Sequence, residues 1–201
     1  MKTKLKSHSL KNELKKYGPF FTLLIEMLFF SIMTESFLSG SNLLSVGRQI
    51  ASTGIASIGV ALCIILGGID ISVGMVLAFA SVIVSKLMVE ASLPIPAAIL
   101  ITLLIGACFG VCIGFCIVIL KMPPMIATLA AEVVAKAIAY LLTSGIPIYS
   151  LPDSFKTIGQ GYLGPIPVSL IIMVVVFAIT YWVLEKTSIG RHIYATGSNK
   201  E

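Results

Sequence analysis

Charged residues are scarce in this sequence. Asp, Glu, Lys and Arg make up 11% of the 201 residues, whereas hydrophobic residues make up 57%, and the mean hydropathy is +1.03. Soluble domains carry about 25% charged residues, so this chain lacks the polar surface that a water-soluble globule exposes. The composition excludes a soluble enzyme, a disordered tail and a disulfide-stapled secreted module.

Residues for catalysis and for nucleotide binding are also missing. Neither His8 nor His192 lies within an apolar run, so a serine protease in the membrane would have no base. Asp70 is the only Asp in or beside an apolar run, whereas an aspartyl protease needs two. The dipeptide Gly-Lys never occurs, which excludes a phosphate-binding loop of the Gly-Lys-Ser/Thr type. We therefore expect no enzyme and no cofactor.

All four cysteines lie in apolar runs and do not indicate a disulfide framework. Three of them repeat every four residues and share one helix face, which could in principle bind a soft metal such as Cu(I). No histidine or methionine cluster accompanies them, so packing is the favoured interpretation and no metal is expected. The cysteines are Cys63, Cys108, Cys112 and Cys116.

The net charge of +5 comes from the N-terminus. Residues 1–17 hold six lysines and one glutamate, and the remainder carries eight basic and eight acidic groups. A basic segment before an apolar run also occurs in signal peptides, but the run from Phe20 is long and lacks a clear cleavage site, which favours a first membrane span. No basic, aromatic-rich stripe of the kind that binds nucleic acid is present.

Six apolar runs approach the roughly 20 residues that cross a bilayer core of about 30 Å. Because lipid offers no partners for backbone polar groups, such runs form helices. We predict an all-α, polytopic integral membrane protein whose lysine-rich N-terminus and C-terminus are both cytoplasmic. Residues 1–17 would be a basic tail, 18–184 the transmembrane domain and 185–201 a cytoplasmic segment. The predicted spans are 20–37, 50–66, 73–89, 97–120, 125–142 and 168–184.

A glycine-rich interruption separates the second and third apolar runs. It reads Gly67-Gly68-Ile69-Asp70-Ile71-Ser72-Val73-Gly74. Such a segment suits a helix end, a tight turn and a new helix start, with Asp70 or Ser72 accepting from free backbone N–H groups. It is either an ordinary turn or a helix break that lines a water-filled path, as in transporters with discontinuous helices.

Charged residues within the runs are the other exceptions. Glu132 and Lys136 have the spacing and order of a favourable helical ion pair, and a charge at the bilayer centre costs about 2.5–3.5 kcal/mol on insertion scales. They are either a structural pair or part of a substrate path. Lys86 and Glu26 are interpreted as snorkelling residues or contacts between helices.

Four motifs, in order, resemble permease subunits of bacterial carbohydrate ABC importers of the ribose, xylose and galactose type. The family reads GGIDLSVG where this chain reads GGIDISVG at 67–74. Residues 121–129 resemble its proline-led helix start, 151–155 its extracytoplasmic loop, and 190–199 its cytoplasmic GRxxYAxGGN segment. The resemblance covers the chain from about Leu38 onward.

The resemblance implies a permease in the bacterial cytoplasmic membrane that imports a ribose-like monosaccharide by alternating access. Its partners would be ATPase subunits that use ATP, a sugar-binding protein outside the cell and a second permease chain. The translocation path would include Asp70, Ser72, Thr128, Glu132, Lys136 and Tyr140. The helix-break motif would consist of Gly67, Gly68, Asp70 and Gly74. The residues that couple the permease to the ATPase would be Gly190, Arg191, Tyr194, Gly197 and Asn199. The binding protein would dock at Pro152, Asp153 and Phe155.

The chain departs from the family pattern at several positions. Ser198 replaces the second glycine of GGN, Lys136 stands where the family usually has Arg, and Glu132 where it usually has an uncharged residue. The family's chains are considerably longer, so several of its membrane helices are expected to be absent here. This leaves an alternative, a truncated membrane remnant or scaffold that transports nothing.

Overall fold

The computed structural model describes residues 2–198. Backbone contacts divide the chain into two compact units, Met1–Gly47 and Arg48–Glu201, and α2 runs across their boundary. The described elements are α1 (Lys2–Met33), α2 (Gly40–Ile65), α3 (Val73–Val89), α4 (Ile95–Val118), α5 (Pro124–Thr143), α6 (Asp153–Gln160), β1 (Tyr162–Leu163), β2 (Ile166–Pro167), α7 (Val168–Lys186) and α8 (Ser188–Ser198).

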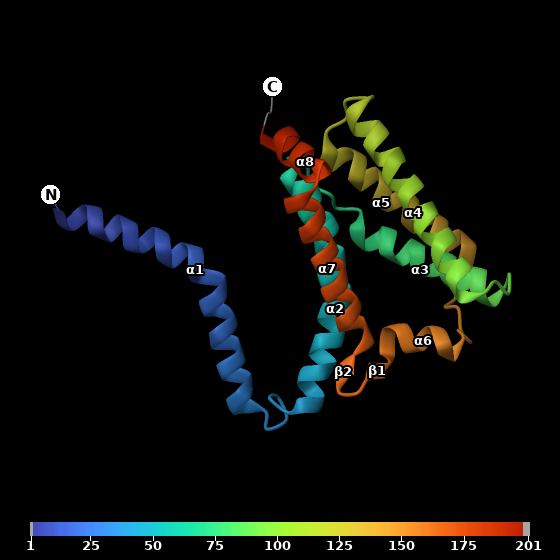
Figure 1. The fold of residues 1–201 in the computed structure, drawn as a ribbon, viewed down its shortest axis with the longest axis horizontal. Coiled ribbons are helices and arrows are strands. Elements are labelled where there is room, and N and C mark those ends of the chain that lie inside the picture. The colour runs from blue at the N-terminus through green and yellow to red at the C-terminus, as the bar shows by residue number, and fades with distance from the viewer. Residues whose placement is uncertain (1, 199–201) are drawn as a thin grey trace. The chain divides into compact units, whose positions relative to one another are not determined.

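The first predicted span is shorter than its apolar run. The helix α1 bends part-way along its length (Figure 1), contains Pro19 and ends at Met33, four residues before the predicted end. A turn follows, in which the N–H of Phe37 donates to the carbonyl of Thr34 at 3.1 Å. The Phe37 ring stacks on Phe30 with centroids 5.7 Å apart. Polar Thr and Ser side chains in this stretch compete with the helix for backbone groups, which favours the turn.

The helix α2 begins ten residues earlier than predicted, at Gly40. Its first turn is stabilised by Ser39, whose hydroxyl oxygen accepts from the N–H of Asn42 at 3.3 Å, as an N-cap residue does. The prediction followed only the apolar run, and residues 40–49 are mixed in polarity. The capping residue was the signal for the true start.

Three helices of the second unit, α3, α4 and α5, pack side by side (Figure 1). The α5 face toward this core is made of small residues, with Ala127, Ala131 and Ala135 all buried. Small side chains let neighbouring helix backbones approach closely, which is how membrane helices gain packing energy without a hydrophobic driving force. The rings of Phe79 on α3 and Phe109 on α4 fill the remaining space, with centroids 5.7 Å apart.

The part of α2 that belongs to the second unit, from Arg48 onward, lies beside α7 (Figure 1). Gly54 of α2 faces Met173 and Phe177 of α7 so closely that an added side chain would displace the Met173 sulfur. The flexible thioether fills the space left by the glycine. The two helices therefore contact each other through a glycine on one and a methionine on the other.

The loop predicted between the fifth and sixth spans is partly structured. It contains the short helix α6 and a two-stranded antiparallel hairpin, in which Tyr162 pairs with Pro167 and Leu163 with Ile166. Gly164 occupies the turn with φ of 62°, a conformation that glycine adopts without strain. The predicted all-α class holds apart from this hairpin.

The fold class, an all-α polytopic membrane protein, is confirmed. Among the described residues, α2, α4, α5 and α7 are long and apolar enough to cross a membrane, while Tyr17–Met33 and Val73–Val89 are shorter apolar helices. Their large apolar side chains are mostly exposed, as expected for a surface in contact with lipid. The count of six crossings and the cytoplasmic location of both termini stay predictions. The cysteines are free, and no cluster of potential metal ligands occurs in the part of the chain that is described.

The end of α2 forms a Schellman motif. The N–H of Gly68 donates to the carbonyl of Cys63 and the N–H of Gly67 to that of Ile64, both at 2.9 Å. Gly67 has φ of 84°, the left-handed conformation that this motif requires. Carbonyls at the helix end are thus satisfied within the chain, and α2 stops where the glycine pair begins.

Replacing Gly67 with alanine tests this turn. A Cβ in the left-handed region costs about 1–2 kcal/mol, so we expect Gly67→Ala to lower the free energy of unfolding by that amount, measured by reversible unfolding in detergent micelles. Gly74→Ala is the matched control, because Gly74 lies in α3 with open space around its Cα. Equal stabilities of the two variants would contradict the left-handed turn.

Candidate functional site

Hydrogen bonds to the Asp70 carboxylate fix the segment between α2 and α3. One of its carboxylate oxygens, Oδ1, accepts from the backbone N–H of Ser72 at 2.8 Å and from the Ser72 hydroxyl at 2.7 Å. The predicted role of Asp70 as an acceptor of a free N–H is confirmed. Ser72 differs from the prediction, because its hydroxyl donates to Asp70 and makes no cap bond to the backbone of α3. Its carbonyl instead accepts from Met75 and Val76 and so starts α3.

The start of α5 packs on this break. Gly68 faces the ring of Pro124, with 3.6 Å between an ideal Cβ and the Pro124 Cβ. Thr128, which is 2% exposed, donates from its hydroxyl to the carbonyl of Ile69 at 3.4 Å and shares that proton with its own helix. The break is therefore bonded to α5 through a buried hydroxyl.

The structure thus brings together three of the six predicted path residues. Asp70 and Ser72 form one hydrogen-bonded turn, and Thr128 contacts the backbone of the same turn. Gly74 follows in the first turn of α3 with nothing packed on it. Both interpretations of this segment, an ordinary turn and a helix break that lines a water-filled path, stay predictions, because these contacts occur in either.

The other three predicted path residues lie further along α5. Glu132 is half-buried, while Lys136 and Tyr140 are exposed. Within the described chain the ion pairs join Lys86 to Glu90 and Lys156 to Asp153, so the pair favoured by the Glu132–Lys136 spacing does not form. Such a pair on a helix surface is worth only about 0.3–0.5 kcal/mol, too little to hold two long side chains together.

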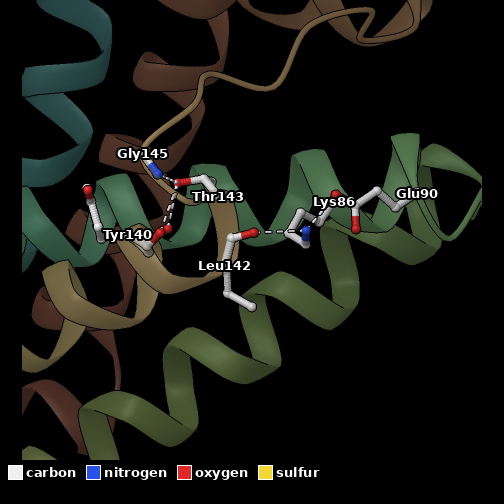
Figure 2. A network of polar contacts seen from close by, with 7 residues as sticks. Lys86, Glu90, Tyr140, Leu142, Thr143 and Gly145 are labelled. Atoms are coloured by element: carbon white, nitrogen blue, oxygen red, sulfur yellow. Dashed lines mark hydrogen bonds and ion pairs between the residues drawn. The ribbon is translucent and has the colours of Figure 1, made fainter.

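Lys86 links α3 to α5, as the interpretation of an interhelical contact predicts. Figure 2 shows its ammonium between two acceptors, the Glu90 carboxylate and the backbone carbonyl of Leu142, the latter at 3.0 Å. The carbonyl belongs to the last turn of α5, where no helical partner is available. Neither Glu90 nor the Leu142 carbonyl was predicted from the sequence as a partner of Lys86.

The C-terminal helix α8 packs on α2 and α7 through two glycines. A Cβ on Gly190 would collide with the backbone carbonyl of Leu184, and one on Gly197 with that of Ile65. Ile65 is the last residue of α2, just before the glycine break. The predicted coupling glycines therefore serve a purpose that the sequence did not reveal, namely direct backbone contact between α8 and the end of α2.

The remaining coupling candidates are accessible. Arg191 is exposed and Tyr194 is 45% exposed, so both side chains are available to a partner. Asn199 lies outside the described residues. Glycines hold α8 on the membrane domain, while larger side chains face outward.

The predicted docking residues begin α6. Pro152 precedes the helix and its carbonyl accepts from the N–H of Phe155 at 2.9 Å. Asp153 pairs with Lys156 at 2.7 Å, and the hydrogen bond and charge of that ammonium hold the pKa of the Asp153 carboxyl below its usual value. Pro152 and Asp153 are exposed, whereas Phe155 is half-buried. Pro followed by Asp was the overlooked signal of a helix start.

Substitution of Gly197 tests the contact between α8 and α2. Its neighbour is a backbone carbonyl, which cannot rotate away, so we expect Gly197→Ala to displace α8 and to destabilise the protein by about 1–3 kcal/mol, as overpacking does. Hydrogen exchange should become faster in α8 and at residues 66–72. Gly59→Ala, in an open position on α2, is the control; unchanged exchange in Gly197→Ala would contradict the contact.

Comparison with known proteins places the chain in a family. Residues 42–201 match the family described as "Branched-chain amino acid transport system / permease component". The chain is 40% identical over 190 residues to the ribose import permease protein RbsC of Bacillus subtilis, covering 94% of this chain and 59% of that protein. It is 35% identical over 204 residues to RbsC of Haemophilus influenzae, covering 100% of this chain and 63% of the relative.

A D-allose transport system permease protein, AlsC of Escherichia coli, is 30% identical over 186 residues, which are 92% of this chain and 57% of that protein. The chain therefore spans less than two-thirds of the length of these curated relatives. No solved structure matches it. The resemblance to carbohydrate permeases is confirmed, and with its apolar helices the chain is a multi-pass protein of the bacterial cytoplasmic membrane. It belongs to the permease-component family that its residues 42–201 match.

Proposed function

We propose that this chain provides the membrane-spanning permease part of an ATP-binding-cassette importer that moves a monosaccharide into the cell by alternating access. Relatives named as ribose and D-allose permeases support the substrate class. The observation that carries the mechanism is the contact of α8 with the end of α2 at the break. A force applied to α8 reaches the helix junction without passing through a flexible side chain.

The proposed partners bind at opposite ends of the helices. Separate ATPase subunits, which use the ATP, contact α8 around Arg191 and Tyr194, on the cytoplasmic side. An extracytoplasmic sugar-binding protein docks on α6 near Pro152 and Asp153. A second permease chain completes the path. This arrangement requires no nucleotide site in the chain itself, in keeping with the missing phosphate-binding loop.

An uncharged sugar needs groups that match its hydroxyls more than it needs an electric field. The break offers the second carboxylate oxygen of Asp70, because both bonds from Ser72 go to Oδ1. Glu132, Lys136 and Tyr140 continue along α5 as further polar groups. We assign these residues to the translocation path.

Sugar uptake into proteoliposomes tests the proposal. The chain is reconstituted with its ATPase subunits and its binding protein, and ATP-driven accumulation of labelled D-ribose and D-allose is measured. Absence of uptake of any aldose tested would contradict the function. We expect combined Arg191→Glu and Tyr194→Ala substitution to reduce uptake at least tenfold, because the outward side chains of α8 would no longer bind the ATPase.

The matched control is Lys121→Glu, which reverses a charge in the exposed connection between α4 and α5 without altering α8. It should retain uptake. If the α8 double variant transports as well as the control, the coupling assignment is wrong even though the transport function stands.

A further inference from the structure

A cavity of about 360 Å³ lies between α3 and the segment that follows α5. Ser81 and Ser85 of α3 and Thr143 of α5 line it with hydroxyl groups, and Val82 and residues 146–148 line it with apolar atoms. The break described above lies at the opposite ends of α3 and α5, where these helices begin. The cavity and the break are thus separated by the length of α5, whereas on α3 the lining begins at Ser81, in the middle of the helix.

The wall on the α5 side is a turn that hydrogen bonds hold in place. Ser144 and Gly145 adopt the left-handed conformation, with φ of 52° and 73°, and so turn the chain away from the end of α5. The Thr143 hydroxyl donates to the carbonyl of Ala139 at 2.9 Å and accepts from the N–H of Gly145 at 3.2 Å (Figure 2). Gly145 lies so close to the Tyr140 ring that an added Cβ would be 2.8 Å from it.

The cavity carries no charge of its own. None of its lining residues is ionisable. Lys86, the next residue after Ser85, is directed to the Glu90 carboxylate and to the Leu142 carbonyl, so its charge is compensated beside the cavity (Figure 2). A charged ligand would find no counter-ion among the lining residues of this open pocket. The lining therefore selects an uncharged ligand.

The hydroxyl oxygens of Ser81 and Ser85 are available to accept hydrogen bonds. Ser81 donates its proton to the carbonyl of Ala78 and Ser85 donates to that of Ser81, both at 2.7 Å. Each serine oxygen keeps its lone pairs for a donor from outside. Opposite these oxygens, the apolar side chains offer a surface for C–H groups. A row of acceptors facing an apolar wall matches a molecule with hydroxyls on one side and C–H bonds on another.

We infer that this cavity is a monosaccharide-binding subsite at the extracytoplasmic end of the path, where sugar released by the binding protein is first held. The inference rests on the proposed function for the side of the membrane and for the ligand class. Small-molecule pockets span about 300–1,000 Å³, and the cavity lies at the small end of that range. It also adjoins the segment that leads to α6, the proposed docking helix.

Cysteine protection tests the subsite on the permease chain alone. Ser85→Cys is introduced into a chain whose four native cysteines are replaced by alanine, and its modification by a maleimide is followed in nanodiscs. We expect saturating D-ribose or D-allose to slow the modification at least fivefold, and glycine betaine at equal osmolality to leave it unchanged. Ala91→Cys, exposed beyond the end of α3, is the control that sugar should not protect.

Uptake provides the second readout. The loss of two acceptors for sugar hydroxyls predicts that the double substitution Ser81→Ala and Ser85→Ala slows uptake at least fivefold. If the unmodified chain takes up sugar while protection is absent and the double variant transports normally, the subsite is wrong and the function stands. If sugar protects Ser85→Cys but no chain transports, the subsite stands and the proposed function fails.

Discussion

The requirement that every backbone polar group find a partner inside the membrane shapes this protein. Lipid offers no hydrogen bonds, so a helix that ends within or near the bilayer must satisfy its free carbonyls and N–H groups from its own chain. The junction between α2 and α3 meets this requirement with two kinds of group. Glycine backbone bonds close the end of α2, and the Asp70 carboxylate accepts from the start of the next segment. Ser72 and Thr128, two buried polar side chains of the second unit, both lie at this junction.

Glycines with different surroundings have different uses here. Gly67 supplies a left-handed turn, whereas Gly197 supplies close approach to a carbonyl. The three glycines spaced along α4, Gly106, Gly110 and Gly114, have open space beside them and serve neither purpose within the described chain. The sequence alone therefore does not show why a glycine is present. Its backbone conformation and its neighbours in the structure show whether it permits a left-handed turn or a close approach.

Much of the fold was predictable because it follows from apolar runs and turn residues. The helices α3, α4, α5 and α7 begin and end within about two residues of the predicted bounds, since proline, glycine and charge delimit them. The starts of α2 and α6 were missed, because they depend on capping by Ser39 and on Pro152, which hydropathy does not register. The contact of Gly197 with Ile65 joins residues far apart in the chain, and no local pattern predicts such a contact.

The sequence predicted which residues belong to the candidate site better than it predicted which of them contact one another. Asp70, Ser72 and Thr128 were all chosen as polar residues in an apolar context, and the structure joins them because α5 packs on the break. The expected Glu132–Lys136 pair depended on side-chain conformations, which spacing alone does not determine. Gly145 and the hydroxyls of the cavity were not singled out, since Ser and Thr in a membrane helix usually bond to their own backbone, as these also do.

One row of residues on α5 connects the helix break with the cavity. Thr128 contacts the break, and Tyr140, three turns later, contacts Gly145 at the cavity. Glu132 and Lys136 occupy the same i, i+4 row between them, which drifts about 40° around the helix at each step. A lysine that faced hydrocarbon at the bilayer centre would cost about 2.5–3.5 kcal/mol, so the exposed Lys136 must face water or protein in the membrane. Polar side chains therefore follow this face of α5 from the helix break to the cavity, and the position of Lys136 closes the face to lipid.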